Sequence, residues 1–103
     1  MRLIYTPEAI RDIRQISVYI RDNLRSPNAA NRISGVILDH CGQLKDFPLL
    51  GMSVQEKTGY ETDLRMLICE HYLAFYQVRD DCVMVARILD SWQDYIKLFF
   101  GQK

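Results

Sequence analysis

Residues 63–90 read DLRMLICEHYLAFYQVRDDCVMVARILD, and this stretch decides the fold. It holds three runs of apolar, aromatic and β-branched residues, separated by the polar dipeptides Glu70-His71 and Asp80-Asp81. Runs of this composition, bounded by polar pairs, are typical of strands joined by short turns. The sequence therefore predicts an antiparallel three-stranded meander, around which the rest of the chain is arranged.

The two predicted turns fix which side chains share a face of the meander. Pairing Cys69 with Tyr72, and Arg79 with Cys82, separates the side chains into two sets. One set is apolar apart from Gln77, so we expect helices to cover it. Its members are Leu64, Met66, Ile68, Leu73, Phe75, Gln77, Met84, Ala86 and Ile88. The opposite face is expected to be open, and its members are Arg65, Leu67, Cys69, Tyr72, Ala74, Tyr76, Val83, Val85 and Arg87.

Two arginines and a tyrosine on the open face are the candidate site. On this register Arg65 lies opposite Tyr76, and Arg87 lies opposite Ala74 one pleat further along. The two arginines would be roughly 12 Å apart, from two interstrand spacings and one two-residue step. Arginines on an otherwise apolar strand face favour a phosphate-binding or partner-binding role over that of solvated charges.

Two helices are predicted before the meander. Thr6, followed by a proline, is expected to cap the first helix, and an apolar stripe at three- and four-residue steps continues to about Leu24. Ser26, also followed by a proline, repeats this start signal for a second helix that ends near Asp46. Because only a few residues separate them, the two helices should form an antiparallel hairpin.

The remaining elements are short. We expect a strand at residues 2–5, an edge strand at 53–57, and a last helix at 91–100 that Asp90 or Ser91 caps. The apolar stripe of this last helix, which should be buried, consists of Trp92, Tyr95, Ile96 and Phe99. The predicted fold class is α+β: an N-terminal strand and helix hairpin packed on one face of an antiparallel β-meander, with a C-terminal helix.

Length and composition limit the possible functions. The 103 residues suit one domain spanning 1–103, and no apolar run reaches the length of about 18 residues that a membrane span needs. Thirteen basic and thirteen acidic residues cancel, whereas free-standing nucleic-acid binders are usually basic. Without a signal peptide, a cytoplasmic protein is expected. The three cysteines do not have metal-ligand spacing, so we expect buried thiols, no metal and no cofactor.

Specific segments accompany this order of elements. They are IYTPEAIRDI at 4–13, YI at 19–20, FP-x-x-G at 47–51, Arg65, YLAFYQV at 72–78, and VARILD at 85–90 followed by Asp94-Tyr95. In this order and spacing the chain resembles the RelE/ParE superfamily of bacterial toxins from type II toxin–antitoxin modules, which includes plasmid stabilisation proteins. The resemblance covers nearly the whole chain.

The resemblance implies a toxin that inhibits growth until a cognate antitoxin binds it, with a homo-oligomer or a hetero-oligomer with the antitoxin as possible assemblies. RelE-like members cut messenger RNA on the ribosome, and ParE-like members poison DNA gyrase. In a nuclease, Arg65 and Arg87 would stabilise negative charge on the scissile phosphate. Tyr76 would orient the RNA or act as an acid, although aromatic cross-strand packing is the commoner role of a strand tyrosine.

The acid–base set of a nuclease is incomplete in this chain. Residues 90–93 read DSWQ where nucleases place histidine, lysine or arginine, and the loop before the meander offers only Glu56 and Lys57. These departures and the zero net charge favour the ParE-like mode. The alternatives are a ribosome-dependent messenger RNA endoribonuclease and a non-toxic module that binds an antitoxin.

Overall fold

The computed structural model describes residues 1–101. In chain order its elements are β1 (Arg2–Tyr5), α1 (Pro7–Asn23), α2 (Pro27–Gly42), the 3₁₀ turn η1 (Gln43–Lys45), β2 (Met52–Ser53), α3 (Val54–Thr58), β3 (Arg65–Cys69), β4 (Tyr72–Val78), β5 (Cys82–Asp90) and α4 (Tyr95–Phe100). The strands form one five-stranded sheet in the order β1-β5-β4-β3-β2. β1 runs parallel to β5, and the other neighbours are antiparallel. The predicted α+β class, meander and helix hairpin are confirmed.

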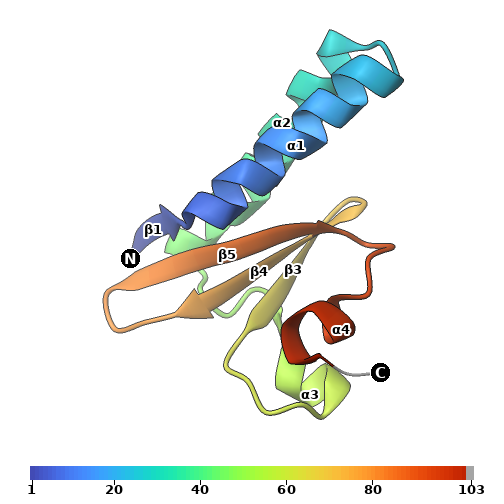
Figure 1. Cartoon of the computed structure of the whole chain (residues 1–103). Coiled ribbons are helices and arrows are strands. Elements are labelled where there is room, and N and C mark those ends of the chain that lie inside the picture. The colour runs from blue at the N-terminus through green and yellow to red at the C-terminus, as the bar shows by residue number, and fades with distance from the viewer. Residues whose placement is uncertain (102–103) are drawn as a thin grey trace.

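The helices begin where the sequence predicts. The Thr6 hydroxyl oxygen accepts a hydrogen bond from the Ala9 amide at 3.1 Å, and that of Ser26 accepts one from the Ala29 amide at 3.1 Å. Each cap satisfies an amide that the first helical turn leaves without a partner. The hairpin packs on the sheet near β1 and extends away from it at the other end (Figure 1). No helix in residues 1–101 is both long and apolar enough to cross a membrane.

The hairpin covers the face of the sheet that was predicted to be open. Its buried helix residues pack in one cluster with sheet residues, all but one of which belong to the face that was predicted to be open. These sheet residues are Leu67, Cys69, Ala74, Tyr76, Val83, Val85 and Ile88. The assignment of the two faces was therefore wrong. Both faces are largely apolar, so the alternation of side chains identifies each face but not which face the helices cover.

A bulge in β5 changes the predicted register halfway along the strand. Tyr76 pairs with Val85 as expected, but Phe75 pairs with Arg87, and so Ala86 has no partner of its own. Arg87 therefore lies opposite Phe75 and not opposite Ala74, which corrects the sequence prediction. An extra residue reverses the in–out alternation beyond it. As a result Ile88 joins the hairpin face.

The other face is covered by α3 and α4, which lie together on the far side of the sheet from the hairpin (Figure 1). Its buried residues are Val54, Met66, Leu73, Phe75 and Leu89. Phe75 contacts Tyr95 and Phe99, with ring centroids 5.1 Å and 4.8 Å apart. Tyr95, Ile96 and Phe99 are only half-buried, so the predicted burial of this stripe is confirmed in part, with one residue as the exception.

That exception is Trp92, which is 91% exposed. The last helix begins four residues later than predicted, at Tyr95, because Asp94 and not Asp90 or Ser91 caps it by accepting from the Lys97 amide at 3.0 Å. The prediction of an edge strand at 53–57 was wrong except at Ser53, because residues 54–58 form the helix α3. Ser53 caps α3 there, and strand pairing is limited to Met52–Ser53.

Candidate functional site

Two of the three predicted site residues hold a loop in place. Tyr76 is fully buried, and its hydroxyl donates to the Pro48 carbonyl and accepts from the Gly51 amide, both at 2.9 Å. Arg65 pairs with Tyr76 in the sheet, as predicted. Its Nη2 donates to the Gly51 carbonyl at 2.6 Å and to the Leu49 carbonyl at 3.3 Å. Neither side chain presents its polar group to a substrate, because each is bonded to the loop at residues 48–51.

Gly51 lets this loop approach the sheet. A Cβ added there would lie 2.6 Å from the Met66 carbonyl oxygen and 2.8 Å from the Tyr76 hydroxyl. Such distances are shorter than van der Waals contact, so only glycine fits. The fixed loop carries exposed apolar side chains, which are Phe47, Leu49, Leu50 and Met52. The glycine of the FP-x-x-G segment, Gly51, is thus required for the close packing of this loop on the sheet.

The third predicted residue, Arg87, is held by α1. Its Nε donates to Asp12 Oδ2 at 2.7 Å and its Nη2 donates to Asp12 Oδ1 at 3.1 Å. The Ile88 amide also donates to Asp12 Oδ2, at 2.9 Å. The hydrogen bond to Asp12 raises the pKa of Arg87, with further contributions from the charges of Asp12 and Glu8. Asp12 thereby both neutralises Arg87 and satisfies an edge amide of β5 beyond the end of β1.

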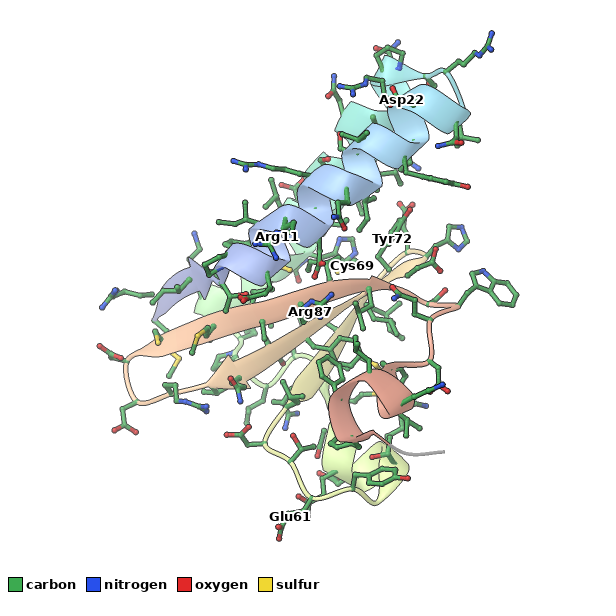
Figure 2. The ribbon with its side chains drawn as sticks, viewed as in Figure 1. Arg11, Asp22, Glu61, Cys69, Tyr72 and Arg87 are labelled. Carbon is green, nitrogen blue, oxygen red and sulfur yellow. The ribbon has the colours of Figure 1, made fainter. Side chains whose placement is uncertain are left out.

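The structure does not bring the three predicted residues into one site. Arg65 and Tyr76 meet at the loop beside β3, while Arg87 lies against α1, as Figure 2 shows for Arg87. Each is occupied by bonds within the chain. Arg65 Nε is buried and lacks a hydrogen-bond partner among the described residues.

A groove of about 270 Å³ lies between α1 and the C-terminal half of β5. It is lined by Asp12, Gln15, Ile16, Tyr19, Tyr72, Arg87, Ile88, Leu89, Asp90 and Gln93. Burial, followed by the charges of Asp90 and Tyr19, raises the pKa of Tyr72. This groove is the principal candidate site, since it combines ionised, amide and phenolic groups in one concave surface.

Sequence reasoning missed the α1 side of this groove. Asp12, Ile16 and Tyr19 are spaced i, i+4 and i+7, which places them on one face of a helix. The apolar stripe that defines the helix lies beside this face, so the polar members were not recognised. The available signal was an aspartate beside the apolar stripe of the helix, because a carboxylate that is buried at such a position needs a partner.

The three cysteines are buried free thiols, as predicted. The hydrogen bond with Cys41 and burial raise the pKa of Cys69, and burial raises the pKa of the adjacent Tyr5, whereas hydrogen bonds with Cys69 and Tyr5 lower the pKa of Cys41. The raised pKa keeps the Cys69 thiol protonated, and a protonated, buried thiol is a poor nucleophile and a poor metal ligand. Residues 1–101 contain no group of three or more histidine, cysteine or acidic side chains that could hold a metal ion.

Comparisons with known proteins agree with this fold. The family described as "ParE toxin of type II toxin-antitoxin system, parDE" matches residues 3–95. A solved structure titled "Chromosomal ParDE TA system from P. aeruginosa" is similar, with a TM-score of 0.73 and 22% sequence identity over 87% of this chain and 95% of that chain. No curated protein matches the sequence. Because the family match spans most of the sequence, the chain belongs to the ParE toxin family of type II toxin–antitoxin systems.

Proposed function

We propose that this member of the ParE toxin family acts by poisoning DNA gyrase and does not cut messenger RNA. The observation that carries this proposal is the state of the three residues that a nuclease would use. Arg65, Tyr76 and Arg87 are all bonded to groups of the chain itself. A general acid must reach the reacting oxygen, and an electrostatic stabiliser must face the developing charge.

The electrostatics of the groove also weigh against RNA cleavage. Asp12 neutralises Arg87 through two hydrogen bonds, and Asp90 adds a negative charge to the same surface. A phosphate would therefore meet a net negative groove. Histidine, the commonest general acid–base side chain, is absent from the groove lining.

Family membership implies an antitoxin as a binding partner. With the nuclease reading disfavoured, the function reduces to binding a protein target and being neutralised by a protein partner. Both tasks need interaction surfaces and no catalytic residues. The exposed apolar loop at 47–52 and the α1–β5 groove are the surfaces available for them.

The test compares the two targets directly. Purified protein is incubated with DNA gyrase, ATP and supercoiled plasmid, and separately with ribosomes translating a defined messenger RNA. We expect cleaved plasmid that appears only when gyrase is present, and we expect the messenger RNA to remain intact. Messenger RNA cuts in ribosome footprints, with no effect on gyrase, would overturn the proposal, and inactivity in both assays would favour the non-toxic binding module.

A Tyr76→Phe variant sharpens this test, because it removes only a hydroxyl. If Tyr76 were a catalytic acid, its loss would lower the rate on the order of 10²-fold or more. We expect the variant to retain its effect on gyrase at a temperature where circular dichroism shows that it is folded. A Tyr95→Phe variant, in which a tyrosine on the opposite face is changed, serves as the matched control.

A further inference from the structure

The α1–β5 groove has two chemically different ends. One end holds the Asp12–Arg87 pair, and the other holds Tyr19, Tyr72 and Asp90. Figure 2 shows Arg87 near the middle of β5 and Tyr72 close to the tip of the sheet, on the side toward the hairpin. From Arg87 to Asp90 the strand advances about 10 Å. The two ends can therefore be occupied independently.

The Arg87 end is internally satisfied. Asp12 is 9% exposed, and its two oxygens accept three hydrogen bonds from Arg87 and the Ile88 amide. A bidentate arginine–carboxylate pair of this kind is geometrically specific and strong. This end has little capacity left for a ligand.

The Asp90 end is not satisfied. Asp90 Oδ1 accepts one hydrogen bond, from the Trp92 amide at 2.8 Å, and no ion pair involving Asp90 is found within residues 1–101. An ionised carboxylate can accept about four hydrogen bonds. Asp90 thus offers a free carboxylate oxygen in a partly buried position, directly across from Tyr72 in the sheet.

The two tyrosine rings that line this end do not stack on other aromatic rings among the described residues. Tyr19 is 60% exposed and Tyr72 is partly buried. The ring–ring contacts among the described residues all lie on the opposite face of the sheet and involve other aromatic residues. Two tyrosine faces therefore border the carboxylate without stacking on a ring of this chain.

The bulge in β5 is what places these groups together. Without the extra residue, Asp90 would point to the α4 face, following Met84 in the alternation. With it, Asp90 lies on the same face as Ile88 and Tyr72, and it lines the groove together with Tyr19 of α1. The same irregularity that moved Arg87 thus builds a negatively charged, tyrosine-lined recess.

A cation complements this recess better than any other group. Among the lining residues the charges are Asp12, Arg87 and Asp90, which sum to one negative charge located at Asp90. Tyrosine faces attract cations, with an attraction of about 0.5–2 kcal/mol. A planar guanidinium can stack on a ring while its forked donors reach a carboxylate, whereas an ammonium cannot stack in this way.

We propose that the Tyr19–Tyr72–Asp90 end of the groove binds an arginine side chain of a partner protein. The antitoxin is the partner that family membership supplies, and its arginine would enter this end of the groove. The proposal does not rest on gyrase as the target. It concerns a binding contact and involves no chemical step.

The experiment uses nuclear magnetic resonance of the ¹⁵N-labelled full chain with a small probe. N-acetyl-L-arginine amide is titrated, and N-acetyl-L-citrulline amide, which has the same shape without the charge, is the control ligand. We expect saturable shifts of the Tyr19, Tyr72 and Asp90 amides with the arginine probe, and binding about tenfold weaker or absent with citrulline. Equal shifts from both probes, or arginine-dependent shifts confined to other regions, would overturn the proposal.

Two variants complete the test. Asp90→Asn retains the acceptor for the Trp92 amide and removes the charge, so we expect about a tenfold loss of arginine binding in a folded protein. Asp63→Asn makes the same change at an exposed carboxylate that is paired with Arg79 outside the groove, and it should bind the probe as the unaltered chain does. If Asp90→Asn binds as tightly as Asp63→Asn, the site assignment is wrong. Neither gyrase nor DNA is present, so this outcome is separate from that of the proposed function.

Discussion

The two faces of the sheet solve the problem of burial in different ways. The hairpin face is covered by two long helices. Hydrogen bonds join Asp12 of α1 to β5, and others join Tyr76 of β4 to the loop at 48–51. The other face is covered by α3 and by α4, a six-residue helix that contacts it through aromatic rings. Directional side-chain bonds tie α1 to β5, while α4 is held on the sheet mainly by contacts of aromatic rings. We therefore expect substitutions on the hairpin face to act on the whole fold and those on the α4 face to act locally.

The largest effect should come from Asp12→Ala. It leaves the Arg87 guanidinium and the Ile88 amide without their acceptor, which should cost about 3 kcal/mol, at the lower end for buried pairs because the Arg87 side chain is 31% exposed. Urea unfolding followed by circular dichroism measures the loss. Asp22→Ala, in which an exposed ion pair with Arg21 is removed, should change stability by less than about 0.5 kcal/mol. Equal effects of the two variants would contradict the assigned role of Asp12.

The next effect should come from the Tyr76→Phe variant described above. Removing the hydroxyl leaves the Gly51 amide and the Pro48 carbonyl without their partner, at a cost of about 1–3 kcal/mol. Tyr95→Phe is the matched change on the α4 face and should cost less than about 0.5 kcal/mol, because the Tyr95 ring supplies the contact with Phe75. If Tyr76→Phe lowered the free energy of unfolding less than Tyr95→Phe does, the hairpin face would not be the more sensitive of the two faces.

A third variant, Phe99→Ala, tests the α4 face. Phe99 is partly exposed, so we expect a loss of about 1–2 kcal/mol, below the value for a fully buried phenylalanine. Hydrogen exchange should show increased opening at α4 and unchanged protection of β4 and β5 amides. The neighbouring Leu98→Ala, at a site that is 48% exposed, is the control. Loss of protection across the hairpin face would show that the two covers are coupled.

The smallest effect concerns an exposed pair at the margin of the sheet. Hydrogen bonds from Gln77 and then Arg79 lower the pKa of Asp63. Because the folded pKa is depressed, its stabilisation is present above the unfolded value of about 3.9 and is lost as pH falls through the folded pKa. Exposure limits the gain, so Asp63→Asn should cost no more than about 1 kcal/mol at neutral pH and nothing near pH 2. A difference that persists at low pH would point to another cause.

Much of the fold was predictable because its signals are local. Thr6 and Ser26 as caps, the turns at residues 70–71 and 80–81, and the family resemblance were all confirmed. The caps depend on side-chain chemistry within a few residues, and the turns on short polar breaks between apolar runs. These features need no knowledge of distant contacts.

The site was not predictable in the same way, because it depends on long-range contacts. The bulge at Ala86 has no glycine or proline to mark it, and it reverses the faces of the following residues. The partner of Arg87 is Asp12, 75 positions earlier, and the partners of Tyr76 lie in a loop 25 and 28 positions earlier. An arginine that binds phosphate and one that closes a structural pair look alike in sequence.

Trp92 is the only tryptophan of the chain, and it is 91% exposed where the chain leaves β5. Its indole is already surrounded by water in the native state, so its fluorescence emission should shift little on unfolding. It is also adjacent in sequence to Gln93, which lines the groove. A partner that covers this end of β5 should move the emission to shorter wavelength. The emission wavelength of Trp92 should therefore report the binding of a partner, while it changes little when the chain unfolds.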